Sequence, residues 1–296
     1  MADPEMRRRT PWSAIDEVEL DQPDLITVAK IIWHTVRDAL AHPFGRILFT
    51  AFLLLMIWGH HGYLELLGEI WPEWRGPGIA PYAPEGYPRP VLLAGVPWDL
   101  ELVFALAGFV LLVVIPCLVI RLWLRRPLSE FGLALPPPDR RTLALLSFVF
   151  LTGVSLPAFY FGASDPEMQA LYPYYRPFTG MGSFVLYQLT ILLFYVTIEF
   201  VFRGYLLFGV AHEEKRLRGG ALVFPHWALL IQMLSYTAWH LGKPLPEVWG
   251  TLVWGLAAGA VTLAIRSVWP VILSHWVLNI FMDWLILKDL GIPPVG

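Results

Sequence analysis

Two ionisable residues lie close together inside a long apolar stretch of the chain. Glu199 and Arg203 belong to the segment LTILLFYVTIEFVFRGYLLFGV, residues 189–210, where most other side chains are apolar. A charge near the centre of a bilayer costs about 2.5–3.5 kcal/mol on insertion scales. The i, i+4 spacing puts both residues on one helix face, where they can pair. The pair either only holds helices together or lines a polar cavity.

Two further polar patterns follow in later apolar segments. Tyr236 and His240 are four residues apart in MLSYTAWHLGKP, near a helix end, where a histidine can also be an interfacial anchor. In LSHWVLNIFMDW, His275, Asn279 and Asp283 stand at i, i+4 and i+8, and so form one polar stripe. Each member needs a hydrogen-bond partner in an apolar setting, so we expect the stripe to face the bundle interior.

These residue types suit hydrolysis by activated water. A glutamate can act as general base, a histidine can share the water, and His and Asn donors can stabilise the oxyanion of a tetrahedral intermediate. The same Glu and His residues, Glu199, His240 and His275, could instead hold Zn²⁺ with a position open to water. The chain has no GxSxG, P-loop or GxGxxG motif, and AHEEKRLRGG at 211–220 is not HExxH.

The composition is that of a membrane protein. Of 296 residues, 56% are hydrophobic and 15% are charged, whereas an ordinary soluble domain is about 25% charged. The net charge of −3 gives no global basic field, so we expect the lipid bilayer and not nucleic acid as a partner. The single cysteine, Cys117, excludes an intrachain disulfide and a Cys-rich metal site.

The apolar segments predict an all-α, polytopic membrane helix bundle. A helix needs about 20 apolar residues to span a bilayer, and about seven segments qualify as transmembrane helices. Residues 72–98, rich in Pro and Gly, are expected to form a loop, and 127–141 a non-spanning connector. The expected spans are 46–64, 101–123, 142–163, 183–210, 220–241, 247–265 and 267–287.

An amphipathic helix is expected before the first span. Leu25, Val28, Ile32 and Val36 recur at helical spacing, and Asp24 can serve as the N-cap. This pattern is typical of an interfacial helix that lies on the membrane.

Charge placement indicates the orientation. Lys and Arg concentrate in the N-terminal segment and in the connections on the same side, so the positive-inside rule places the N-terminus in the cytoplasm. We expect three parts: a cytoplasmic N-terminal segment with the amphipathic helix (1–45), two transmembrane helices with the Pro/Gly-rich loop (46–126), and a membrane domain with the polar motifs (127–290).

The ordered motifs Glu199-xxx-Arg203, Tyr236-xxx-His240 and His275-xxx-Asn279 resemble those of the CPBP family, the CAAX-protease and bacteriocin-processing (Abi) membrane endopeptidases. The family motifs read EExxxR, FxxxH and HxxxN. The resemblance covers about 127–287, including PLSEFGL before the third span. It implies a multi-pass protein, expected in the bacterial inner membrane, that cleaves membrane-anchored proteins or peptides near their C-terminus. The 127–290 part would be the catalytic membrane domain.

The resemblance also implies roles for the motif residues. Glu199 would be the base and His240 its partner on the water, while His275 and Asn279 would form the oxyanion site. Arg203 would orient Glu199 or bind a substrate carboxylate. The reaction can be written without a metal, and we prefer that form; if a metal is present, its ligands would be those named above. Three residues are expected to support the site: Arg203, Tyr236 and Asp283.

The sequence departs from the family pattern at two positions. Tyr236 stands for the usual Phe, and the first motif Glu falls at Ile198. Adjacent helix residues point about 100° apart, so Glu199 does not simply replace the missing carboxylate. The chain is therefore either an endopeptidase with Glu199 as base or a catalytically inactive relative that binds peptides, confers immunity or acts as a scaffold. A carrier or channel is a third hypothesis, without inverted repeats to support it.

Overall fold

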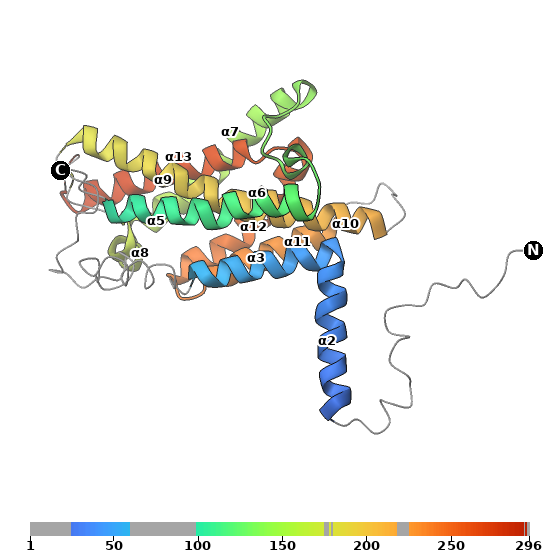
Figure 1. The fold of residues 1–296 in the computed structure, drawn as a ribbon. Coiled ribbons are helices and arrows are strands. Elements are labelled where there is room, and N and C mark those ends of the chain that lie inside the picture. Colours follow the sequence, from blue (N-terminus) through green and yellow to red (C-terminus); the bar gives the residue numbers. More distant parts are fainter. Residues whose placement is uncertain are drawn as a thin grey trace, which may run out of the picture. The chain divides into compact units, whose positions relative to one another are not determined.

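The computed structural model describes residues 25–59, 99–174, 178, 180–217, 225–292 and 294, and this part contains helices and no strand (Figure 1). The expected all-α fold is confirmed. The Asp24 cap and the loop at 72–98 lie outside the described residues. Two compact units, 1–49 and 50–296, are described separately, and the expected three-part division stays a prediction.

In the first unit, α2 (Leu25–Ala41) is the expected amphipathic helix. Its apolar side chains, among them Leu25 and Ile32, are exposed, as a helix lying on a membrane requires. The next helix, α3 (Pro43–Gly59), begins with a proline. Proline suits this position, because an N–H group in the first turn of a helix has no intrahelical partner.

The chain is an integral membrane protein. Among the described residues, five helices are sufficiently long and apolar to cross a bilayer. The number is six if the bent pair Leu25–Ala41 and Pro43–Trp58 forms one span. About seven were expected. The fifth expected span is short: α11 (His226–Trp239) has 14 residues, because Pro225 precedes it and a turn with Gly242 at φ +96° follows. The five spans are Ala105–Trp123, Pro138–Ala163, Met181–Arg216, Leu245–Ile265 and Trp269–Asp289.

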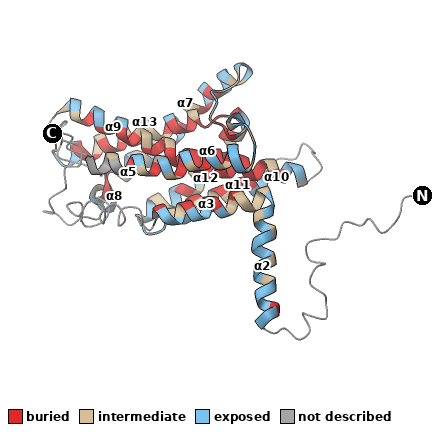
Figure 2. Cartoon of the chain, in the orientation of Figure 1, coloured by how far each residue is buried: buried red, intermediate tan, exposed pale blue. Residues whose placement is uncertain are grey.

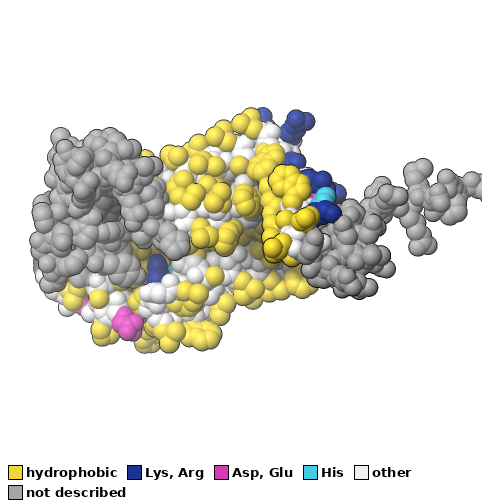
Figure 3. Space-filling model, turned by 60° about the horizontal axis from the view of Figure 1, so that its bottom comes forward, with side chains coloured by type: hydrophobic (Ala, Val, Ile, Leu, Met, Phe, Trp, Pro, Cys, Tyr) yellow, Lys and Arg dark blue, Asp and Glu magenta, His cyan; other side chains and the backbone are white. Residues whose placement is uncertain are grey.

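The second unit is a bundle around one central helical rod. The span Met181–Arg216 is the most buried of the five, and Figure 2 shows its buried residues between less buried neighbours. Its α9 (Met181–Glu199) packs against α5 (Asp99–Phe109) and α13 (Trp269–Asp289). The remaining major contacts join α13 to α7 (Arg141–Ala163) and α11 to α12 (Leu245–Ile265). Apolar side chains lie over much of the described surface in the view of Figure 3, as lipid contact requires.

The central rod changes its winding directly after Glu199. A π-helix, η8 (Phe200–Phe208), follows α9 and leads into α10 (Gly209–Leu217). Such segments often mark functional sites, because the wider turn re-aims the side chains. Gly204 is needed here: a Cβ would lie 2.3 Å from the Phe200 ring and 3.0 Å from the Phe131 carbonyl oxygen.

Residues 127–137 of the connector between the second and third expected spans lie outside the candidate spans, as predicted, whereas the span Pro138–Ala163 begins within the expected connector. The connector contains two short 3₁₀ turns, η6 (Leu128–Phe131) and η7 (Pro138–Arg140). The N–H of Val268 donates to the Gly132 carbonyl oxygen at 3.0 Å, and the Ser267 hydroxyl to that of Ala134 at 2.8 Å. The connector thus fixes the turn that begins α13.

The α12 helix contains a GxxxG motif, GLAAG at residues 255–259, and such small residues let one helix pack closely on another. A Cβ on Gly259 would lie 2.6 Å from both Leu229 and Gln232 of α11. The Gln232 amide donates to the Gly255 carbonyl oxygen at 2.6 Å. The α11–α12 pair, which carries Tyr236 and His240, is therefore held at short range.

Candidate active site

Glu199 is the centre of the buried polar site. It is the last residue of α9 and is fully buried. Its Oε1 lies 2.7 Å from Nδ1 of His275 in α13 and 3.4 Å from the Trp254 indole nitrogen in α12. Its Oε2 lies 3.3 Å from a terminal nitrogen of Arg203. The structure thus brings together Glu199, Arg203 and His275, which the sequence placed on two separate segments.

The Glu199 contact fixes the state of the His275 ring. A carboxylate only accepts hydrogen bonds, so Nδ1 of His275 carries the proton and donates it. Nε2 of the neutral ring then keeps a lone pair. Glu199 is fully buried but the His275 side chain is 14% exposed, so His275 is the more accessible residue of the pair.

The Arg203 guanidinium is buried, and its N–H donors are not used in hydrogen bonds within the described residues. Its central carbon lies 3.9 Å from the centre of the Tyr236 ring, a cation–π contact, and its ion pair is with Glu199. None of its nitrogens has a hydrogen-bond partner among the residues that the structure describes. Buried polar groups are usually satisfied, so this one has unused capacity to bind an oxygen.

His240 reaches the site through Tyr236. The two rings are 4.4 Å apart, and Nδ1 of His240 donates to the Tyr236 carbonyl oxygen at 2.8 Å. Its Nε2 therefore keeps a lone pair in the neutral ring. His240 is near enough to Arg203 and His275 for electrostatic interaction, although it makes no hydrogen bond to Glu199 in the described part of the chain.

The expected stripe on α13 faces the bundle interior, where Asn279 and Asp283 form a second polar cluster. Asn279 accepts a hydrogen bond from the Tyr195 hydroxyl at 2.9 Å and donates to Asp283 at 2.8 Å. The Gln188 amide donates to the same Asp283 oxygen at 2.8 Å. The Tyr195 ring is 4.2 Å from that of His275. Asn279 thus supports His275 through Tyr195 and has its donors engaged.

Some of these partners carried a signal in the sequence. Gln188, Tyr195, Glu199 and Arg203 are spaced seven, four and four residues apart, which is one helix face. Trp254 carried none, because a tryptophan in an apolar helix is ordinary there.

A third polar cluster lies beside His240 and was not expected. Nε2 of His240 is 3.6 Å from Oε1 of Glu247 in the first turn of α12. The Lys243 ammonium donates to that oxygen at 2.7 Å and to the Tyr172 hydroxyl at 2.9 Å. The Tyr172 hydroxyl in turn donates to the Glu247 carboxylate, 3.0 and 3.1 Å from its two oxygens.

Lys243 and Tyr172 of this cluster keep their protons over the physiological pH range. Burial alone would lower the pKa of Lys243, but Tyr174 and Glu247 raise the pKa by more, so it lies above its ordinary value. Burial, and then the charge of Glu247, raise the pKa of Tyr172 well above its ordinary value. Lys243 is therefore a cation and Tyr172 a neutral donor.

A metal centre is not assembled from the residues named for it. The described residues contain no group of three His, Cys, Asp or Glu side chains placed to hold a metal ion. Nδ1 of His275 is hydrogen-bonded to Glu199, and Nε2 of His240 lies 3.6 Å from Oε1 of Glu247. A pocket of about 480 Å³ contains none of the expected site residues; it is lined by Arg126, His212, Glu213, Lys215 and Arg216.

Ile198 is a buried apolar residue, as its type demands. The residue beside it, Glu199, supplies the carboxylate that this helix brings to the site. The register of the central rod thus directs Glu199, not position 198, at His275.

The family comparison covers the same residues. Residues 180–281 match the family model described as Rce1-like, type II CAAX prenyl endopeptidase Rce1-like. No curated protein matches the chain, and no solved structure does. The matched range contains Glu199, Arg203, His240, His275 and Asn279. The resemblance to the CPBP proteins is thereby confirmed, because residues 180–281 match a model of the CAAX protease family.

Proposed function

We propose that the protein is an intramembrane endopeptidase that hydrolyses a peptide bond near the C-terminus of a membrane-associated protein or peptide. The observation that carries the proposal is the 2.7 Å contact between Glu199 and His275, two residues that both lie in the range matched by the protease family model. A carboxylate–imidazole pair that is shielded from bulk water is suited to activating a single water molecule.

Glu199 and His275 would act together as the base. Glu199 accepts the hydrogen bond from Nδ1 of His275, so the lone pair of this ring is on Nε2. That lone pair would take a proton from the water while the water oxygen adds to the peptide carbonyl carbon. His275 then gives that proton to the leaving nitrogen as the C–N bond breaks. The expected oxyanion role of His275 is less suitable, because its neutral ring has no second donor.

His240 would be the second imidazole on the same water. Its Nε2 lone pair can accept the other hydrogen of the water, which ends as the proton of the new carboxyl group. That proton passes to Nε2 of His240 when the carboxylate product forms. No step of this reaction runs through zinc.

Arg203 is the donor that we assign to the substrate. Its guanidinium is next to Glu199 and lacks hydrogen-bond partners within the described residues, so it can hold a carbonyl oxygen, the oxyanion or a substrate carboxylate. Tyr236 positions Arg203 and His240, and Asn279 and Asp283 position Tyr195 against His275. Asn279 would therefore act on the reaction through its neighbours.

The experiment compares membranes before and after incubation with purified protein. Membranes from a host without this protein are incubated with wild type, Glu199→Gln or His275→Gln in detergent, and C-terminal peptides are identified by mass spectrometry. We expect C-terminal truncations with wild type and their loss in both variants. His226→Gln, at an exposed histidine of α11, is the control that keeps activity. Equal truncation with wild type and Glu199→Gln would refute the proposal.

A second candidate is an inactive relative that binds membrane peptides without cutting them. Its support is Ile198, which occupies the position of a motif glutamate and packs as an ordinary core residue. Wild-type turnover in the experiment above excludes this candidate. A bacterial inner-membrane location with the N-terminus in the cytoplasm remains our expectation for either function.

A further inference from the structure

The carboxylate of Glu247 stands next to a histidine of the site, although it belongs to none of the sequence motifs. Its Oε1 lies 3.6 Å from Nε2 of His240, the nitrogen that keeps a lone pair. The site therefore contains two carboxylate–imidazole pairs, Glu199 with His275 and Glu247 with His240. The second pair takes its carboxylate from α12, whereas α9 has Ile198 at the position of the first motif glutamate.

The position of Glu247 is fixed by two donors. Lys243 and Tyr172 both donate to its carboxylate, at 2.7 Å and at 3.0–3.1 Å. Only about 15% of the Glu247 side chain is exposed. A carboxylate that is held in this way has one orientation, unlike a surface glutamate that moves among rotamers.

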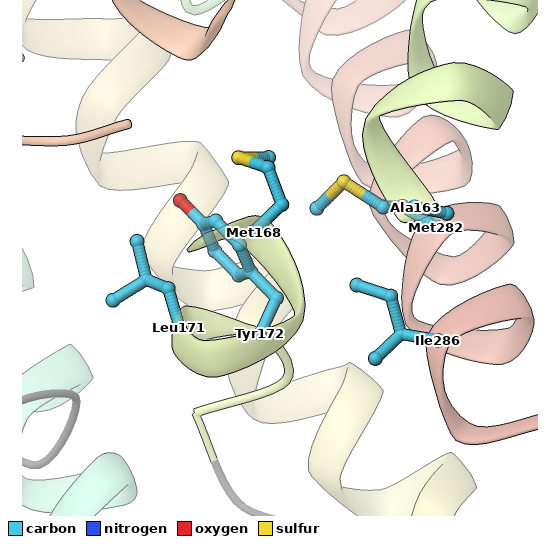
Figure 4. Close-up of a cluster of buried hydrophobic side chains, with 6 residues drawn as sticks. All are labelled: Ala163, Met168, Leu171, Tyr172, Met282 and Ile286. Carbon is cyan, nitrogen blue, oxygen red and sulfur yellow. The ribbon is translucent and has the colours of Figure 1, made fainter. Parts of the chain in front are cut away.

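Tyr172 is in turn anchored by apolar packing. It follows α8 (Pro166–Leu171), a helix that starts at Asp165, whose side chain accepts from two backbone N–H groups. Figure 4 shows the Tyr172 ring beside Met168, with its hydroxyl oxygen pointing away from Met282. The buried cluster that holds the ring consists of Ala163, Met168, Leu171, Tyr172, Met282 and Ile286. The position of the Glu247 carboxylate thus depends, through Tyr172, on the packing of α7, α8 and α13.

The negative charge of Glu247 lies beside the His240 ring, which the proposed reaction would make positive. In the neutral state of His240, its Nε2 and the Glu247 oxygen are both acceptors, so neither satisfies the other. When Nε2 takes the proton of the new carboxyl group, the ring becomes a cation at 3.6 Å from an anion, which is a favourable ion pair. The proton comes from the product acid, and the pair of electrons that receives it is that of Nε2.

We propose that Glu247 is a positioning residue of the proposed endopeptidase, and that it stabilises the protonated ring of His240 during turnover. The role rests on the proposed function. Glu247 itself touches neither the water nor the substrate, and it acts through His240 alone.

The test uses the full-length protein and a membrane substrate found in the truncation experiment. Glu247→Gln keeps the size of the side chain and removes its charge, so we expect kcat to fall about tenfold or more at nearly unchanged KM. Glu247→Asp, which keeps the charge, should recover part of kcat. Glu167→Gln removes an exposed carboxylate from α8 and should leave kcat unchanged. In a His240→Ala background, Glu247→Gln should have no further effect on kcat.

A double variant distinguishes an effect of Glu247 on turnover from a purely structural role. Lys243→Met/Glu247→Gln removes both charges of the buried pair, so it avoids an unpaired lysine if Glu247→Gln alone does not fold. We expect its thermal stability to recover relative to Glu247→Gln while kcat stays low. A double variant with wild-type kcat, or a Glu247→Gln variant with wild-type kcat, would overturn the role of Glu247 and leave the proposed function intact. Wild-type protein without turnover would overturn the proposed function and this role with it.

Discussion

Nδ1 of His275 lies 2.7 Å from Oε1 of Glu199, a contact between residues 76 positions apart in the chain. The contact joins the end of α9 to α13 inside the bundle, next to the π-helix that begins at Phe200. A hydrogen bond to a charged group in a region of low dielectric is stronger than in water. The same contact therefore contributes to helix packing and to the proposed chemistry.

Glu199 and His275 should behave as one unit in kinetics. We expect Glu199→Gln and His275→Gln each to lower kcat by roughly 10²–10⁴-fold, since either change removes the paired base. The double variant should be about as slow as the slower single variant, because groups that act together are not additive. Single-turnover rates with a membrane substrate measure this. Independent, multiplying losses would show that the two side chains act separately.

Ile198→Glu should not improve the enzyme. The new carboxylate would replace a side chain that is 1% exposed and would enter an apolar environment without a partner. We expect a loss of roughly 2 kcal/mol or more in stability and no gain in kcat. Thermal unfolding in detergent and turnover measure the two effects, with Ile198→Leu as the matched apolar control. A variant that gains activity over an inactive wild type would favour the inactive-relative hypothesis.

The sequence predicted the parts of the site that follow one helix face. Glu199 and Arg203 pair at i, i+4 as expected, and the stripe on α13 turns inward to Tyr195 and Gln188 of α9. Helix periodicity fixes such relationships before any tertiary contact forms. The convergence of α9 with α13 was expected because isolated polar groups in a membrane need partners.

Other contacts could not be read from the sequence. Trp254 and Glu247 belong to α12, and their place beside Glu199 and His240 depends on how closely α12 packs on its neighbours. Hydropathy also does not show where α11 stops, so the expected span 220–241 is longer than the helix His226–Trp239 found within the described residues. Such features depend on tertiary packing and on turn geometry more than on local periodicity.

The cluster around Asn279 should contribute to stability. Tyr195→Phe removes the hydroxyl that donates to Asn279 at 2.9 Å and leaves a buried amide oxygen without that donor. We expect a loss of about 1 kcal/mol, as for an unmade buried hydrogen bond. Tyr160→Phe, at a tyrosine that is 55% exposed, is the control and should have little effect. Equal unfolding temperatures for the two variants would contradict the prediction.

Gly259 should tolerate a side chain less well than Gly250 in the same helix. A Cβ at Gly259 would lie 2.6 Å from atoms of Leu229 and Gln232, whereas nothing lies within 4 Å at Gly250. We expect Gly259→Ala to destabilise by about 1–3 kcal/mol through overpacking. Gly250→Ala should be neutral or stabilising by up to about 1 kcal/mol, because alanine is the better helix former. Unfolding midpoints in one detergent compare the pair, and the reverse order would show that α11 and α12 are less closely packed.

Lys243 should stabilise the fold up to strongly alkaline pH. Its pKa is raised in the folded protein, because Tyr174 and Glu247 more than offset the effect of burial. A group with a raised folded-state pKa contributes fully below its unfolded value, about 10.4, and loses that contribution as the pH rises through the folded value. We therefore expect Lys243→Met to lower the unfolding temperature by a constant amount from pH 6 to 9, and the difference from wild type to narrow only above about pH 10.4. Lys288→Met, at an exposed lysine, is the matched control and should have little effect at any of these pH values. A difference that already narrows between pH 6 and 9 would show that Lys243 loses its proton there and does not hold Glu247 as a cation.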